Sequence, residues 1–134
     1  MGFAYLRTVY LADTDAAGVV YFAKGMSICH EAYEDWLTSI DIKIRDLIRE
    51  QQVALPIIHS SIDFFAPAFC GDQLIIRLEV QITKPSEFMV NYQIFQAANP
   101  KKLIIKGVTK HVAINPTTRS RVDLPLAIRE NTGD

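Results

Sequence analysis

The segment from residue 73 to residue 114 constrains the possible folds most, because three β-type runs follow one another in it with short turns between them. The first run, QLIIRLEVQIT, alternates apolar and polar residues with a period of two, which predicts a long strand with one face in water. The second and third runs are FMVNYQIFQ (88–96) and LIIKGVTKHVAI (103–114). Pro85 and Pro100 lie in the gaps between the runs, so we expect an antiparallel meander.

Two more strands and a long helix precede this meander. Segments 3–12 and 56–65 have the composition of strands. Between them, the apolar residues from Phe22 to Ile40 are spaced by three and four positions, which is the period of a helix. A short second helix is expected at Ile44–Glu50. This order predicts the α+β class, with the long helix packed across a five-stranded antiparallel sheet.

Length and charge narrow the class of protein. The 134 residues contain no linker-like segment, so we expect one domain over residues 1–134. A net charge of −1 gives no basic footprint for nucleic acid, which favours a small molecule as the partner. The N-terminus does not resemble a signal peptide, and no apolar run approaches the roughly 20 residues of a membrane span. We therefore expect a cytoplasmic protein without a membrane anchor.

The spacing of the cysteines bears on zinc binding and disulfide formation, and the hydrophobic content bears on the oligomeric state. Cys29 and Cys70 are far apart and belong to no C-x-x-C pair, so we expect neither a zinc site nor a disulfide framework. Hydrophobic residues make up 49% of the chain, which is a high share for a small monomer. One helix cannot cover five strands. We therefore expect a homodimer that forms by extending the sheet.

The stretch DTDAAGVVYF (13–22) places two carboxylates just before the predicted helix, and several interpretations compete for it. Asp13 or Asp15 could cap the helix, because a short side-chain oxygen can accept from the first free N–H groups. A phosphatase of the haloacid-dehalogenase type is disfavoured, because Ala17 stands where its motif has Thr or Val and because the expected sheet is antiparallel. A metal site is also disfavoured, because no histidine has a ligand spacing to these carboxylates; the histidines are His30, His59 and His111.

Acyl transfer is the interpretation that uses every part of this stretch. A carboxylate in this strand-to-helix loop can attack a carbonyl or activate water if the developing oxyanion is stabilised. The unpaired N–H groups at a helix start, here from Val20 to Phe22, can supply that stabilisation. Gly18 would allow the backbone to approach a ligand closely.

Three segments carry a resemblance to a known family: YLADTDAAGVVYF, CHEAYEDWL and LPIIHSSIDFFAPAFCGDQL. They resemble the hotdog-fold acyl-CoA thioesterases of the 4-hydroxybenzoyl-CoA thioesterase class, over roughly the whole chain. Within this class the sequence is most similar to the enzymes that hydrolyse 1,4-dihydroxy-2-naphthoyl-CoA in phylloquinone biosynthesis. The resemblance implies a sheet wrapped around one long helix, homodimers that often form homotetramers, and active sites at the subunit interface.

The resemblance also implies roles for individual residues. Asp15 becomes the catalytic carboxylate, as a nucleophile or as a general base, and the backbone N–H of Phe22 polarises the thioester carbonyl. Asp13 becomes structural. The substrate is an acyl-CoA, and no separate cofactor is implied because coenzyme A is part of it. Its phosphates imply a basic pocket mouth, for which the candidates are Lys84, Arg119 and Arg121.

Contacts to the acyl group are expected from two places. Val20 and Tyr21 adjoin the catalytic stretch, and His59 and Ser61 share one strand face with Asp63. These three side chains could contact an aromatic acyl group or pair across a dimer seam. The seam is favoured for Asp63, and both interpretations stay open for His59. A broad short-chain or fatty acyl-CoA or acyl-carrier thioesterase is the alternative function. A non-catalytic hotdog module that binds acyl-CoA is a third possibility.

Overall fold

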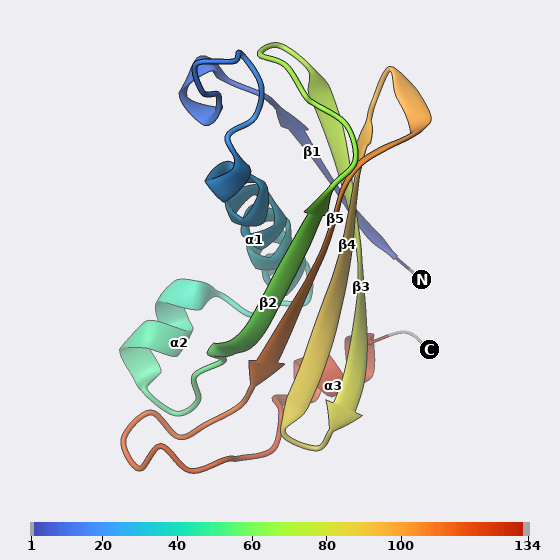
Figure 1. Cartoon of the computed structure of the whole chain (residues 1–134). Coiled ribbons are helices and arrows are strands. Elements are labelled where there is room, and N and C mark those ends of the chain that lie inside the picture. The colour runs from blue at the N-terminus through green and yellow to red at the C-terminus, as the bar shows by residue number, and fades with distance from the viewer. Residues whose placement is uncertain (1, 133–134) are drawn as a thin grey trace.

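In the computed structural model, which describes residues 2–132, five strands form one sheet in the order β1-β3-β4-β5-β2. Every neighbouring pair of strands is antiparallel. The long helix α1 (Phe22–Ser39) lies across one face of this sheet (Figure 1). The predicted α+β class, with a five-stranded antiparallel sheet around one long helix, is confirmed. The strands are β1 (Phe3–Thr8), β2 (Ile57–Phe64), β3 (Gln73–Lys84), β4 (Glu87–Gln96) and β5 (Asn99–Val112).

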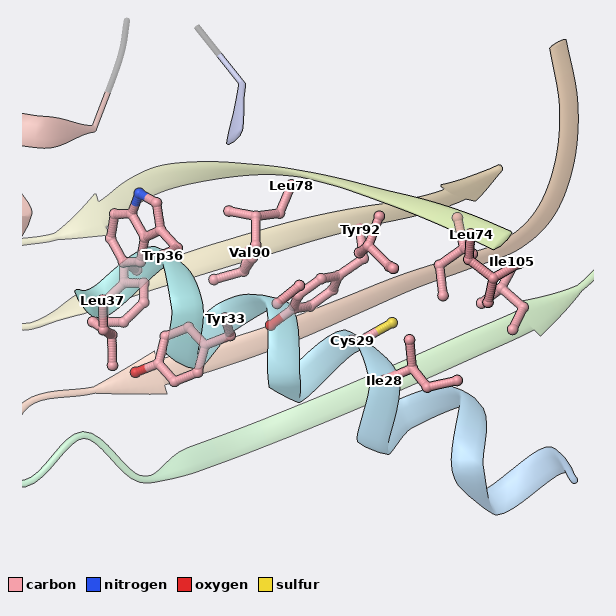
Figure 2. Close-up of a cluster of buried hydrophobic side chains, with 14 of the residues drawn as sticks. Ile28, Cys29, Tyr33, Trp36, Leu37, Leu74, Leu78, Val90, Tyr92 and Ile105 are labelled. Atoms are coloured by element: carbon pink, nitrogen blue, oxygen red, sulfur yellow. The ribbon is translucent and has the colours of Figure 1, made fainter. Parts of the chain in front are cut away.

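The core forms where the apolar stripe of α1 meets the sheet. Ile28 and Leu37 of α1 are fully buried, and Figure 2 shows this side of the helix facing Val90 and Tyr92 of β4. Gly25 permits the close approach, because a Cβ there would lie 2.9 Å from the Ile62 Cδ1 atom of β2. None of the helices within residues 2–132 combines the length and apolar character needed to cross a bilayer.

The shorter helices and two strand boundaries differ in part from the sequence prediction. The expected helix α2 (Ile44–Glu50) is present, but α3 (Leu126–Asn131) was not predicted. The first strand ends at Thr8 rather than at residue 12, because the chain turns into the 3-10 helix η1 (Leu11–Asp13). The last strand begins earlier than predicted, because Asn99 already pairs with Gln96 across the β4–β5 turn.

Strand β2 is an exposed edge of the sheet. It pairs with β5 along one side, and no other strand within residues 2–132 pairs with its second side. Seven of its eight residues are exposed, and only Ile62 is half-buried. Large apolar side chains are among the exposed ones, including Ile58 and Phe64. An edge of this kind presents unpaired backbone groups to any further strand.

A chain of buried polar groups crosses the core beside α1. His111 lies against the ring of Phe88, with ring centroids 4.7 Å apart, and is fully buried. The Leu55 carbonyl lies 3.4 Å from His111 Nδ1 and can only accept, so the proton belongs on Nδ1. His111 Nε2 then accepts from the Thr109 hydroxyl at 2.8 Å. That hydroxyl in turn accepts from Tyr92 at 2.9 Å, so the core contains a neutral histidine with both nitrogens paired.

This arrangement predicts a loss of stability in mild acid. Burial lowers the pKa of His111 from 6.5 to about 4, so the unfolded chain takes up the proton first as the pH falls. The stability contributed by the neutral ring is therefore complete above pH 6.5 and is lost as the pH falls to about 4. The free energy of unfolding should drop by about 3 kcal/mol over this range. Urea titrations at several pH values should show this drop in the wild type and a flatter dependence in His111→Gln. An equal slope in both proteins would contradict it.

Candidate active site

Asp15 lies on a tight hairpin that joins η1 to the start of α1. Its backbone N–H donates to the Val19 carbonyl at 3.0 Å, and the Gly18 N–H donates to the Asp15 carbonyl at 2.9 Å. Thr14 and Val20 form an isolated antiparallel bridge at the base of this turn. Gly18 has φ 81°, a conformation that side chains disfavour, so glycine is needed for the turn itself. The hairpin therefore fixes the backbone of Asp15 by local hydrogen bonds.

Asp15 is exposed and lies at a hollow in the surface. One of its oxygens, Oδ1, accepts the Ala17 N–H at 2.8 Å, which holds the side chain in an Asx turn. Asp15 also lines a cavity of about 450 Å³, within the size range of small-molecule sites. Its other oxygen makes no hydrogen bond within residues 2–132. The carboxylate is thus held in place with one oxygen available.

The walls of this cavity are mainly apolar and aromatic. Tyr21, Phe22, Phe64 and Phe65 are all exposed, and they come from the start of α1 and the end of β2. Such walls suit a flat apolar or aromatic group. The remaining lining residues are Val19, Val20, Ala66, Pro67, Ala68, Ile104 and Ile105.

Among the backbone N–H groups around the start of α1, some already donate a hydrogen bond within the chain and some do not. The Val20 N–H donates to the Ala68 carbonyl at 2.9 Å, and the Tyr21 N–H donates to the Asp13 carbonyl at 2.9 Å. The expectation that these two amides would face a substrate carbonyl is therefore wrong. The N–H groups of Phe22 and Ala23 have no acceptor in the part of the chain that the structure describes. Phe22 is thus the first amide of the helix that can donate to a ligand.

Neither aspartate of the motif caps the helix, so that expectation is wrong for both. Tyr21 occupies the N-cap position and makes no side-chain capping bond. Asp13 is buried and accepts the Tyr10 N–H at 2.9 Å as well as two N–H groups of Arg7. Hydrogen bonding from Arg7 lowers the pKa of Asp13 below its ordinary 3.8. Asp13 is therefore an ionised structural group.

The structure does not bring His59 and Ser61 into this cavity within one protomer. Side chains alternate along a strand, and Ile62 and Phe64 are the β2 residues that face α1. His59 pairs with Lys110 and Ser61 with Val108, so both lie on the opposite face of the sheet. Whether they contact an acyl group stays a prediction.

The three predicted coenzyme A contacts also lie away from the cavity within one protomer. Lys84 ends β3, and Arg121 Nη1 lies 3.9 Å from Glu87 Oε1 at the start of β4. Glu87 pairs with Val112 of β5, whereas the cavity is at Ile105. Seven residues of strand separate these positions, roughly 23 Å. In Figure 1 the β3–β4 turn and the loop after β5, which carries Arg119, lie at the opposite end of the sheet from the start of α1.

A second hollow, of about 250 Å³, lies at that opposite end, between α1 and α2. Sequence reasoning did not identify it, because its walls come from four segments that meet only in the folded chain. No cluster of three or more metal-ligating side chains occurs within residues 2–132. The second hollow is lined by His30, Tyr33, Ile44, Leu47, Ile48, Gln51, Val53, Ala54, Leu55 and Pro116.

The chain is similar to a known protein family and to proteins with assigned names. Residues 9–132 match the family described as the thioesterase-like superfamily. A 1,4-dihydroxy-2-naphthoyl-CoA hydrolase of Crocosphaera subtropica is 48% identical over 126 residues, which cover 94% of this chain and 92% of that protein. The protein of the same name from Rippkaea orientalis is 50% identical over 126 residues, covering 94% and 91%.

Solved structures agree with the sequence relatives. The crystal structure of a 1,4-dihydroxy-2-naphthoyl-CoA thioesterase from Synechocystis superposes with a TM-score of 0.92 at 43% sequence identity. The match covers 96% of this chain and 93% of that one. The hotdog fold expected from the sequence is therefore confirmed.

Proposed function

Because the chain belongs to the thioesterase-like superfamily, we propose that it hydrolyses an aromatic acyl-CoA, with 1,4-dihydroxy-2-naphthoyl-CoA as the substrate in phylloquinone biosynthesis. The products are 1,4-dihydroxy-2-naphthoate and coenzyme A. One observation carries the proposal: Asp15 and Phe22, whose N–H has no acceptor within residues 2–132, line the same apolar cavity. The names of the similar proteins from Crocosphaera subtropica and Synechocystis support the choice of acyl group.

The two groups divide the chemistry between them. The Phe22 N–H donates to the thioester oxygen, which gains negative charge as the carbonyl carbon becomes tetrahedral. Asp15 either removes a proton from a water molecule that attacks this carbon, or attacks the carbon itself to give a mixed anhydride that water then hydrolyses. In both routes a new C–O bond replaces the C–S bond. The thiol of coenzyme A leaves after taking up a proton. Either route needs one carboxylate within reach of the carbonyl carbon, and Asp15 is accessible from solvent.

The apolar walls favour an aromatic acyl group over a polar one. Phe64 and Phe65 are exposed at the cavity, so a flat ring placed there removes apolar surface of both partners from water. Each square ångström buried in this way contributes roughly 25 cal/mol. No separate cofactor takes part in the proposed reaction, because coenzyme A belongs to the substrate.

The proposed active unit is a homodimer joined along the β2 edge. Two antiparallel β2 strands related by a two-fold axis place the start of one strand beside the end of the other. The end of β2 adjoins the cavity at Phe64, whereas the start adjoins Ala54, which bridges Ile114. The loop that follows Ile114, with Arg119 and Arg121, would then lie near the cavity of the second copy. Sedimentation as a monomer at micromolar concentration would contradict this assembly.

None of the described residues that line the cavity is a lysine or an arginine, and the proposed dimer would bring cations from the second copy. Coenzyme A carries a diphosphate and a 3′-phosphate, for which guanidinium groups are suited partners. Arg119 and Arg121 of the second copy are our candidates for these contacts, with Lys84 at the same end of the sheet. The same symmetry brings the second copy's hollow between α1 and α2 toward the cavity. Each copy contributes one cavity, so the dimer has two equivalent sites. Two such dimers would form the expected homotetramer.

A substrate panel tests the proposed function. We expect 1,4-dihydroxy-2-naphthoyl-CoA to give a kcat/KM at least about tenfold above that of benzoyl-CoA and of aliphatic acyl-CoAs, because the larger ring fills more of the apolar cavity. The measurement is release of free coenzyme A from each thioester under identical conditions. A preference for aliphatic substrates would indicate the broad-specificity thioesterase instead. Binding of coenzyme A without turnover of any thioester would indicate a non-catalytic module.

A further inference from the structure

Arg7 joins three parts of the chain next to the candidate site. Its Nη1 and Nη2 atoms donate to both Asp13 oxygens, at 2.6 and 3.1 Å. Its Nε and Nη2 atoms donate to both oxygens of Glu31 in α1, at 2.6 and 3.1 Å. The Arg7 side chain is 13% exposed and that of Asp13 is 5% exposed. Because a planar guanidinium donates to each carboxylate in a paired geometry, it fixes direction as well as distance.

The two arms of the Asp15 hairpin are anchored to different parts of the molecule. The outgoing arm leads to Phe22, and it is held by the β2–β3 loop through the Val20 N–H and the Ala68 carbonyl. The incoming arm leads to Asp15 and begins at Asp13, whose carboxylate is held by Arg7. The β2–β3 loop therefore anchors the arm with the amide donor, and Arg7 anchors the arm with the carboxylate.

Asp13 also connects the two arms to each other. Its backbone carbonyl accepts the Tyr21 N–H at 2.9 Å, immediately before Phe22. Asp13 is buried, so loss of its partner would leave a carboxylate in a site with little water, and the residue would shift or become protonated. Either change would be transmitted over two residues to Asp15.

We propose that Arg7 is a positioning residue of the thioesterase reaction, which holds the Asp15 carboxylate at a fixed separation from the Phe22 N–H by orienting Asp13. This role rests on the function proposed above. Arg7 does not line the cavity, so it acts without touching the substrate. A displacement of about 1 Å between reacting groups can lower a rate by roughly 100-fold, so a second anchor of this kind matters for kcat.

Arg7→Lys is the direct test, because it keeps the positive charge and removes the paired donor geometry. We expect kcat to fall by about 10- to 100-fold while KM changes by less than about threefold, since the cavity walls are unaffected. Asp13→Asn should lower kcat in the same way, because an amide cannot accept from both Arg7 nitrogens as well as a carboxylate can. Rates should be measured with 1,4-dihydroxy-2-naphthoyl-CoA, at a temperature at which circular dichroism shows each variant fully folded.

Glu31→Gln is the matched control. This substitution weakens the contact of the Arg7 guanidinium with Glu31 and leaves the Arg7–Asp13 pair in place. We expect it to lower the stability of the fold about as much as Asp13→Asn does. We expect its kcat to stay within about threefold of the wild type. Arg49→Lys, which alters the exposed Arg49–Asp46 pair on α2, controls for a change of arginine to lysine elsewhere.

The outcomes separate the positioning role from a merely structural one. Wild-type kcat in folded Arg7→Lys and Asp13→Asn, or an equal loss of kcat in Glu31→Gln, would overturn the proposal. If Arg7→Lys does not fold, the comparison of Asp13→Asn with Glu31→Gln decides in the same way. Failure of both Arg7→Lys and Asp13→Asn to fold would assign the pair to folding and would also overturn it. Full activity of Asp15→Asn would instead refute the proposed site itself.

Discussion

Replacing Asp15 by Asn is expected to lower kcat by about 1000-fold, because the amide can neither attack the thioester carbon nor accept a proton from water. The hairpin should survive the change. The amide oxygen of Asn can still accept the Ala17 N–H that the carboxylate accepts at 2.8 Å. The thermal midpoint should therefore stay close to that of the wild type. Release of free coenzyme A from 1,4-dihydroxy-2-naphthoyl-CoA, measured beside a thermal melt, checks both expectations.

Asp41→Asn is the matched control for this substitution. Asp41 is exposed just beyond the other end of α1 and has φ 66°, a conformation that Asn tolerates as well as Asp does. It removes the same charge at a distance from the cavity, so kcat should remain at the wild-type value. Wild-type turnover by Asp15→Asn would exclude the carboxylate from the reaction.

Replacing Phe22 by Pro is expected to lower kcat by about 100- to 1000-fold, the usual effect of removing one oxyanion donor. Phe22 is the first residue of α1, the position at which a helix accepts proline most readily. Tyr21 has φ −64° and ψ 138°, which is the extended conformation that a residue before proline adopts. The substitution should thus delete one N–H group and leave the helix in place. Steady-state kinetics and circular dichroism measure the two effects separately.

Phe22→Ala separates the backbone from the side chain. It removes the same ring, which is 65% exposed at the cavity, but it keeps the N–H. We expect Phe22→Ala to raise KM more than it lowers kcat, because the ring contributes to the cavity wall. Equal kcat values for the Pro and Ala variants would show that this N–H does not assist the reaction. The neighbouring Ala23 N–H also has no acceptor within residues 2–132, so it could replace part of the oxyanion stabilisation that Phe22→Pro removes.

The parts of the fold that the sequence predicted are those with a regular pattern over many residues. Helix α1 and strand β3 each bury one face, so their apolar residues recur with the period of the backbone. Helix α3 was missed because it has six residues and buries only Ile128, which is too short for a period to appear. The end of β1 was missed because the Asp13 carboxylate takes the Tyr10 N–H and turns the chain.

Some features of the candidate site are set by residues close together in the sequence and could be predicted, whereas others depend on residues far apart in the sequence. Asp15, Gly18 and Phe22 lie within eight residues and form one hairpin and one helix start, so their arrangement could be read from the motif. The motif did not show which N–H groups are available to a ligand, because the Val20 N–H donates to the carbonyl of Ala68, a residue from another loop. Arg7 was overlooked for the same reason, since its partner Glu31 lies on the long helix. The sequence showed that His59 shares a strand face with Ser61, but it did not show which of the two faces of the strand α1 covers.

Different kinds of structure supply the reacting groups and the cavity walls. The Asp15 carboxylate and the Phe22 N–H are placed by the hydrogen bonds of a hairpin, a helix start and the Arg7–Asp13 pair, whereas Phe64, Phe65 and Ile105 line the cavity from other segments. Wall residues can therefore be exchanged without moving the reacting groups. A scaffold with this division can acquire new acyl preferences by a few substitutions, and a library directed at these three wall positions would be a practical start for redesign.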